Sequence, residues 1–202
     1  AKVVVVGDTT KRDIKQQLAF FENWQGDAAP IVRPERITDL KEQKIYLVDK
    51  PNAPQSIVRL VRRGLPFDAT GELYMSKLAN FNLAGNFNSR INQNLREDKG
   101  YTYGARSFFW GGKADGGYTA TASVRADVTD KSFVEFEKEI KQYHQSGMTA
   151  DELEFMRKAV GQRDALKYET PRQKLGFIAN ILEYGLDKSF VDQQSKIIEA
   201  AK

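Results

Sequence analysis

The stretch 101–125 carries the pattern that most constrains the fold of this chain. Two strand-like runs, 101–110 and 118–125, are joined by the seven-residue segment 111–117, which contains four glycines. In the second run small or apolar residues alternate with polar ones, which is the two-residue period of a strand with one buried face. The pattern predicts two adjacent antiparallel strands linked by a glycine-rich turn.

The remaining predicted elements indicate the class of the fold. Further strands are expected at 3–6, 45–49 and 56–62, and residues 27–43, which have no clear period, indicate a connecting loop. Apolar residues at the spacing of one helix face predict helices over 14–24, 74–83, 91–95, 129–146, 149–160, 171–184 and from 189 onward. Because adjacent strands form hairpins and the helices come in blocks, the order favours an α+β two-layer sandwich with a largely antiparallel sheet over a doubly wound sheet.

Several helix ends have their own signals. Thr149 and Glu152 have the spacing of a capping box. Thr170 followed by Pro171 is typical of a cap with proline at the first helical position. Gly85 suits a left-handed helix C-terminus.

The rare residues exclude several kinds of chemistry. The chain has no cysteine and one histidine, His144, which is predicted to lie in the last turn of the 129–146 helix. Disulfides, thiol catalysis and thiolate zinc sites are therefore excluded, and H-E-x-x-H zinc binding needs two histidines. We expect His144 to interact with the helix C-terminus, and we expect no metal site in this chain.

Charge and hydropathy argue against two other classes of partner. The net charge of +4 comes from 31 basic and 27 acidic residues, which is too even a balance to indicate nucleic acid. The densest basic run, Arg59, Arg62 and Arg63, is interpreted as a solvated strand face. No stretch approaches the roughly 18 apolar residues of a membrane span, so no span is expected.

The ends of the chain suggest a piece of something longer. The sequence opens on Ala1-Lys2 without methionine and runs directly into a strand pattern. We expect residues 1–202 to form a single domain, cut from a longer chain and truncated at its C-terminus. The compartment is not determined by the sequence; a periplasmic or cell-envelope location is favoured for a bacterial source.

One polar segment, 88–104, holds the candidate site. Arg96 falls in the last turn of a short predicted helix, and Tyr103 enters the following strand seven residues later. A helix-to-strand reversal can bring both donors to one end of the sheet, where they could hold a carbonyl oxygen that gains negative charge. The alternative is structural: Arg96 caps the helix C-terminus and Tyr103 is a half-buried strand aromatic.

The same segment resembles a known family. The run from Gly85 to Tyr103 is similar to the G-x-x-S-R-L…L-R-E-x-x-G-x-x-Y pattern in the second type of domain of insulinase/pitrilysin zinc metallopeptidases, which include the mitochondrial processing peptidases. Supporting similarities are Val3–Asp8 with Trp24, the Lys50–Ser56 run, and the Gly147–Leu153 helix start. Ile91 replaces the usual leucine, and the chain stops short of the family's closing helix and strand.

The resemblance implies a fold and a role. The fold would be an α+β sheet with helices packed mainly on one face. Zinc would be held by a partner domain bearing H-x-x-E-H, in the same parent chain or another subunit, and this chain would be inactive alone. Arg96 and Tyr103 match the family's Arg and Tyr that contact peptide substrate near the scissile bond. A catalytically inert assembly subunit remains the alternative, and a nucleic-acid-binding module is the weakest reading.

Overall fold

The computed structural model describes residues 2–27, 30 and 42–202 of the chain. They divide into two compact units. The first comprises residues 1–37 and 162–188, and the second comprises residues 38–161 and 189–202. Most of the connection expected at 27–43 lies outside the described residues.

The second unit is built on a three-stranded antiparallel sheet. Its strands are β1 (Gln55–Gly64), β2 (Thr102–Gly111) and β3 (Gly116–Arg125), in the order β1-β3-β2. Strands β2 and β3 pair up to Gly111 opposite Gly116, which confirms the predicted hairpin. A Cβ on Gly116 would lie 1.9 Å from the Leu65 carbonyl oxygen, so this turn needs glycine for the close approach of another backbone segment.

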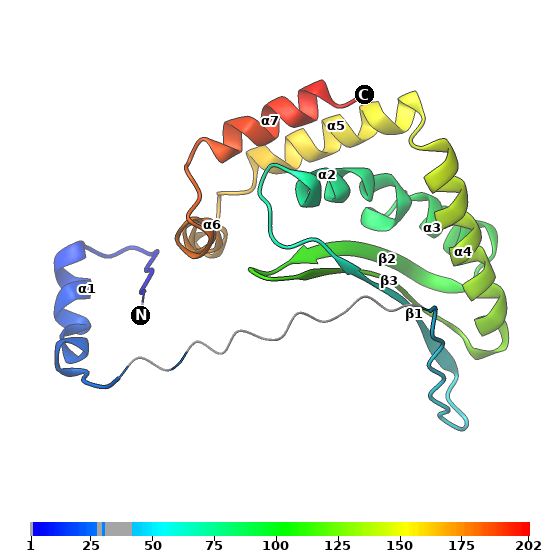
Figure 1. The fold of residues 1–202 in the computed structure, drawn as a ribbon, viewed down its shortest axis with the longest axis horizontal. Coiled ribbons are helices and arrows are strands. Elements are labelled where there is room, and N and C mark those ends of the chain that lie inside the picture. The colour runs from blue at the N-terminus through cyan, green and yellow to red at the C-terminus, as the bar shows by residue number, and fades with distance from the viewer. Residues whose placement is uncertain (1, 28–29, 31–41) are drawn as a thin grey trace. The chain divides into compact units, whose positions relative to one another are not determined.

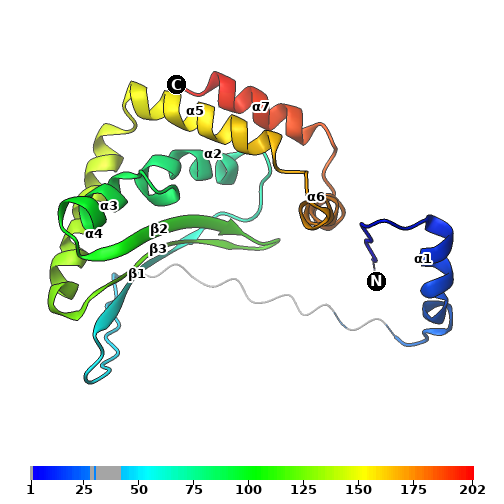
Figure 2. The same ribbon diagram turned by 180° about the vertical axis from the view of Figure 1, so that it is seen from behind.

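Helices cover one face of this sheet. Figures 1 and 2 show α2 (Glu72–Ala79), α3 (Arg90–Asn92) and α4 (Thr129–Ser146) on the same side of the strands. Ile91 of α3 and Phe136 of α4 meet the inward residues of β3 in one core, which includes Val58, Leu83, Ile91, Leu95, Ala120, Ala122, Val124 and Phe136. The α+β class, with helices on one face of an antiparallel sheet, is confirmed.

A second apolar cluster adds a further layer of helix. Helices α5 (Ala150–Ala165) and α7 (Phe190–Ala200) lie side by side in both views. Met156, Val160 and Ile198 from these helices pack with Leu78 and Phe81. Burial of these apolar side chains therefore holds α7 against α2 and against the turn that follows α2.

Most of the predicted helix ends are confirmed. Thr149 N–H donates to Glu152 Oε2 (2.8 Å) and Glu152 N–H donates to Thr149 Oγ1 (3.2 Å), which is the reciprocal pattern of a capping box. Thr170 caps α6 (Pro171–Tyr184). Gly185 ends α6 in the left-handed conformation, with φ of 64°.

Four local predictions differ from the structure. The segments 3–6 and 45–49 form no strand within the described residues, because residues that favour extended backbone do not by themselves supply a neighbouring strand. The helix predicted over 14–24 is α1 (Lys11–Gln17) followed by a 3₁₀ turn, Ala19–Asn23. Gly85 is not left-handed; it ends the π-helical turn Phe81–Gly85 and its N–H donates to the Asn80 carbonyl oxygen (3.1 Å).

The first unit has little internal packing. Neither α1 nor α6 contains a buried residue. Phe21 stacks on Trp24 with ring centroids 5.1 Å apart, and Lys2 Nζ donates to the Leu182 carbonyl oxygen (2.7 Å). In the described part of the chain, no helix combines the length and the apolar character needed to cross a membrane.

Candidate functional site

Arg96 sits where the chain turns from helix into strand. The π-helical segment Gln93–Asp98 follows α3 and is anchored by the fully buried Leu95. Gly100 adopts a φ of +61°, and Tyr101 N–H then donates to the Leu95 carbonyl oxygen (2.8 Å). Glycine tolerates this left-handed backbone at little cost, so the reversal predicted at Gly100 forms directly before β2.

The Arg96 side chain lies at the surface. Its Nη1 atom is 2.5 Å from Glu97 Oε1, and its guanidinium carbon is 4.1 Å from the centre of the Phe87 ring. The Arg96 side chain is 32% exposed and that of Glu97 is 50% exposed. Its carboxylate partner is therefore a solvated one, and the guanidinium is held against an aromatic face without being buried.

Tyr103 is turned outward by a β-bulge. Thr102 pairs with Val124 and Ala105 pairs with Ala122, so Tyr103 and Gly104 together face only Ser123. A bulge of this kind redirects side chains on the longer strand. The Tyr103 side chain is 90% exposed, not half-buried as the structural alternative expected.

The two candidate residues are both accessible, and no direct bond joins them. Within the described residues, Arg96 contacts Glu97 and Phe87, and the Tyr103 side chain has no hydrogen bond. They lie at the two ends of one short reversal, 96–103. As a cation and a phenol, both can donate hydrogen bonds to an oxygen of a bound molecule.

Buried asparagines, which the sequence reasoning missed, hold this reversal in place. Asn92 Oδ1 accepts from Ala105 N–H (2.7 Å), and Asn92 Nδ2 donates to the Ala105 carbonyl oxygen (2.8 Å). Asn80 bonds Ser107 at two points: its Nδ2 donates to the Ser107 carbonyl oxygen (3.0 Å), and its Oδ1 accepts from the Ser107 hydroxyl (2.5 Å). The density of asparagine between 80 and 94 was the available signal, since a buried amide must find backbone partners.

A second missed feature is the ion pair of Arg90. Its guanidinium donates to both carboxylate oxygens of Glu152, each at 2.6 Å, and to the Gly147 carbonyl oxygen at 2.9 Å. The bond from Arg90 lowers the pKa of Glu152 below its ordinary value. Burial, followed by the charge of Glu152, raises the pKa of the neighbouring Tyr143 to about 12. Arg90 therefore fastens the candidate segment to the start of α5.

The described residues do not fit a zinc site. His144 is exposed and stands in the last turn of α4, as predicted. In the described ranges no group of three or more histidine, cysteine, aspartate or glutamate side chains is placed to hold a metal ion. Zinc prefers nitrogen and sulfur ligands, and one isolated imidazole cannot supply a tetrahedral set.

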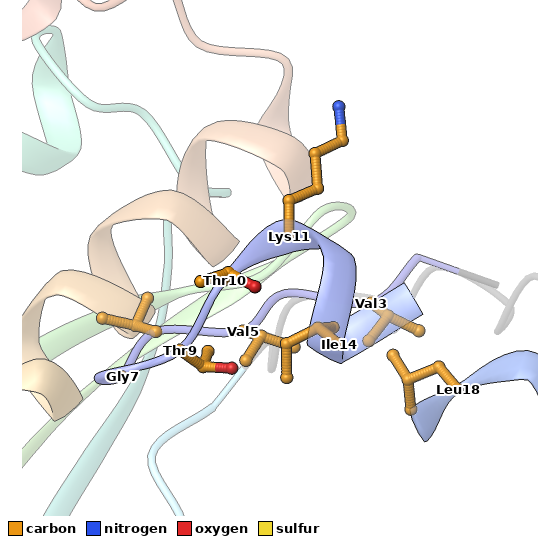
Figure 3. A pocket seen from close by; sticks show the side chains of 9 residues that line it. Val3, Val5, Gly7, Thr9, Thr10, Lys11, Ile14 and Leu18 are labelled. Atoms are coloured by element: carbon orange, nitrogen blue, oxygen red, sulfur yellow. The ribbon is translucent and has the colours of Figure 1, made fainter. Parts of the chain in front are cut away.

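A pocket in the first unit offers volume without catalytic groups. It measures about 520 Å³ and lies between the extended N-terminal segment and α1. Figure 3 shows Val3, Val5, Ile14 and Leu18 lining it, with the Lys11 side chain extending away. Its lining has hydroxyl groups and this one amine but no acid or imidazole, so we assign it no chemistry.

Comparisons with known proteins agree with this architecture. Residues 1–160 match the family described as Peptidase M16 inactive domain. The chain is 27% identical over 198 residues to YmxG of Helicobacter pylori, which is described as a non-peptidase homolog. The aligned region covers 93% of this chain and 43% of that relative. The chain therefore spans less than half the length of this curated relative.

Solved structures share the fold. A protease from Helicobacter pylori superposes with a TM-score of 0.78 at 15% identity, over 98% of this chain and 48% of that one. The M16 inactive domain from Pseudomonas fluorescens gives 0.66 at 20% identity, over 74% and 36%. The periplasmic protease PqqL from Escherichia coli gives 0.68 at 14% identity, over 97% and 22%.

The family match covers far more than half of the chain, and the fold agrees with solved members. The resemblance to the insulinase/pitrilysin-type zinc peptidases is thereby confirmed at the level of the family. The chain belongs to the family of M16 peptidase inactive domains.

Proposed function

We propose that this chain is the substrate-side domain of an M16-type zinc metalloendopeptidase. It binds peptide and supports proteolysis by a zinc-bearing H-x-x-E-H domain, in the same parent chain or in a partner subunit. The observation that carries the proposal is the 90% exposure of Tyr103 at a bulge, seven positions after the accessible cation of Arg96 in the same helix-to-strand reversal.

The exposure of Tyr103 favours a binding role over a packing role. An aromatic ring left in water contributes almost nothing to folding, since the hydrophobic gain requires burial. The bulge, fixed by the Asn92 bonds to Ala105, places the ring outside the core at a defined point of the backbone. Bulges are common beside active sites because they aim a side chain.

The chemistry of the pair suits a peptide carbonyl. During peptide hydrolysis the carbonyl oxygen gains negative charge, and donors held in place before the reaction stabilise that charge. The guanidinium of Arg96 stays cationic at any physiological pH, and Phe87 and Glu97 limit its motion. The zinc and the water-activating glutamate would come from the facing domain.

A catalytically inert structural role is the second candidate. The observation that favours it is the description of the relative YmxG as a non-peptidase homolog. In that case Arg96 and Tyr103 would be inherited without function, and the domain would serve assembly alone.

Kinetics of the assembled peptidase separate the two candidates. We expect Arg96→Ala and Tyr103→Phe each to lower kcat/KM. If each side chain stabilises the developing oxyanion, the activation free energy should rise by about 2–4 kcal/mol. Tyr46→Phe, which changes another exposed tyrosine, is the matched control and should leave kcat/KM unchanged. Unchanged kinetics in both site variants, with zinc bound in the facing domain, would favour the structural role.

A further inference from the structure

The face of the sheet turned away from the helices is an exposed surface, here called the outer face. Alternate residues of each strand point inward, among them Val58, Ala122 and Ala105, and their sequence neighbours point outward. The outer face comprises Ile57, Arg59, Val61 and Arg63 of β1, Gly117, Thr119, Thr121, Ser123 and Arg125 of β3, and Arg106, Phe108 and Trp110 of β2, with Tyr103 at the bulge. In Figures 1 and 2 the helices of this unit lie on the opposite side.

This sheet carries charge of one sign only. The three strands contain five arginines and no lysine, aspartate or glutamate. Arg125 pairs with Asp127 at 3.0 Å. Arg59 and Arg106 are exposed, and neither has an ion pair in the part of the chain that the structure describes. The outer face therefore offers two guanidinium groups to an external anion.

The register places these two arginines in one row. Arg59 and Arg106 both stand opposite Thr121, one on each side. Neighbouring strands are about 4.8 Å apart, so the two Cα atoms are separated by about 10 Å. Side chains as long as arginine can reach a single carboxylate placed above Thr121 from both sides.

Two apolar side chains lie beside the Arg59–Arg106 pair, two residues further along the strands. Val61 and Phe108 stand on either side of Thr119, and their side chains are 71% and 45% exposed. Successive rows are two residues apart along the strands, or about 6.7 Å, which is also the spacing of same-side residues in an extended peptide. An extended peptide lying along the strands would thus set alternate side chains on successive rows.

The edge of β2 is closed to a different mode of binding. Peptides often add to a sheet as an extra strand by bonding the free backbone groups of an edge. At Ala105 both backbone groups are taken by the Asn92 amide, and at Ser107 the carbonyl oxygen is taken by Asn80. These bonds protect the β2 edge as charged residues do in other sheets.

We propose that the outer face binds an extended peptide with an acidic residue flanked, at its second neighbours, by apolar residues. The acidic side chain lies between Arg59 and Arg106, and an apolar side chain lies between Val61 and Phe108. This inference rests on the proposed function, because it assumes that the bound peptide is the substrate. It adds the chemical class of that substrate. A nucleic acid is disfavoured because the chain carries 27 acidic residues against 31 basic ones, too even a balance for a nucleic-acid surface.

Binding to the purified chain tests this without any zinc-bearing partner. The probe is a fluorescently labelled peptide with the repeating sequence Glu-Ser-Val-Ser. Fluorescence anisotropy measures its affinity for the chain. We expect the double variant Arg59→Glu/Arg106→Glu to weaken binding by about tenfold or more, and added salt to weaken binding to the unmodified chain. Arg62→Glu is the control: it reverses one arginine charge on β1, as Arg59→Glu does, but lies opposite Tyr118, on the helix side, and should bind as the unmodified chain does.

Three results would overturn the inference. The first is equal affinity for peptides carrying glutamine or lysine in place of glutamate. The second is undiminished binding by the double variant. The third is tighter binding of a single-stranded oligonucleotide that the double variant abolishes. Unchanged kinetics in the Arg96 and Tyr103 variants would instead count against the proposed function alone.

Discussion

Arg90 and Glu152 form a two-point ion pair that joins the candidate segment to the beginning of α5. Both nitrogen–oxygen distances are 2.6 Å, and the side chains are only 19% and 24% exposed. Glu152 also accepts from Thr149 N–H, so one carboxylate caps a helix and holds an arginine. Six residues beyond Arg90, Arg96 has, among the described residues, only the solvated Glu97 as its carboxylate partner, which separates a structural arginine from a candidate functional one.

Breaking this ion pair should destabilise the second unit. We expect Glu152→Gln to lower the free energy of unfolding by about 2–3 kcal/mol, because a partly buried guanidinium loses a charged acceptor. Urea denaturation followed by circular dichroism measures the change. Glu154→Gln, which removes an exposed pair with Lys158 one turn along the same helix, is the control and should behave as the unmodified chain. Equal effects in the two variants would contradict the prediction.

The same pair should make stability depend on acid pH. The pKa of Glu152 is lowered from 4.5 in the folded chain, first by the hydrogen bond from Arg90. A carboxylate with a depressed folded pKa stabilises the fold above its unfolded pKa, and this contribution is lost as the pH falls through the folded value. We expect the urea midpoint to drop on acidification from about pH 6 to about pH 3.5, and to drop less in Glu152→Gln. An identical pH dependence in both proteins would show that other carboxylates account for it.

Asn92→Ala should open the edge of β2. It removes both bonds to Ala105 and leaves a buried N–H and C=O without partners, at a cost of about 1–3 kcal/mol for each group. Hydrogen exchange at the Ala105 amide should accelerate along with the loss of stability. Asn88→Ala changes an exposed asparagine of the same segment and should alter neither measurement. Slow exchange at Ala105 in Asn92→Ala would mean that the amide is protected by something else.

The candidate pair should be nearly neutral for stability. Arg96→Ala loses a surface contact with Phe87 and an exposed pair with Glu97, worth together about 1 kcal/mol or less. Tyr103→Phe removes one hydroxyl from a side chain that is 90% exposed. We expect thermal unfolding of Tyr103→Phe to match that of the unmodified chain and that of Arg96→Ala to differ little. A large loss in either would indicate a structural role.

The isolated chain should bind no zinc at a specific site and cleave no peptide. With a single histidine and no cysteine, it lacks the ligands of a tetrahedral zinc centre. Elemental analysis after dialysis against zinc should find less than one ion per chain, and a quenched peptide should stay intact. Stoichiometric zinc, or peptide cleavage that a chelator stops, would refute this prediction.

Patterns of short range were read correctly from the sequence. The hairpin of β2 and β3, the capping box at Thr149 and the cap at Thr170 depend on residues close together in the chain. Alternation and side-chain capping express local backbone energetics, so these features do not require a distant partner. The segments 3–6 and 45–49 were wrongly predicted as strands, since a strand requires a neighbour and a local pattern does not supply one.

The sequence by itself determined the β2–β3 hairpin and most of the helices, the lack of cysteine and of a second histidine for a zinc site, and the place of Arg96 and Tyr103 at one helix-to-strand reversal. The tertiary structure decided what each side chain faces. The register of β2 with β3 created the bulge that exposes Tyr103, the Arg90–Glu152 pair spans 62 positions, and Arg59 and Arg106 became neighbours only across β3. Such relationships depend on which distant segments pack together, and packing is governed by total apolar burial and buried hydrogen bonding, which no local pattern records.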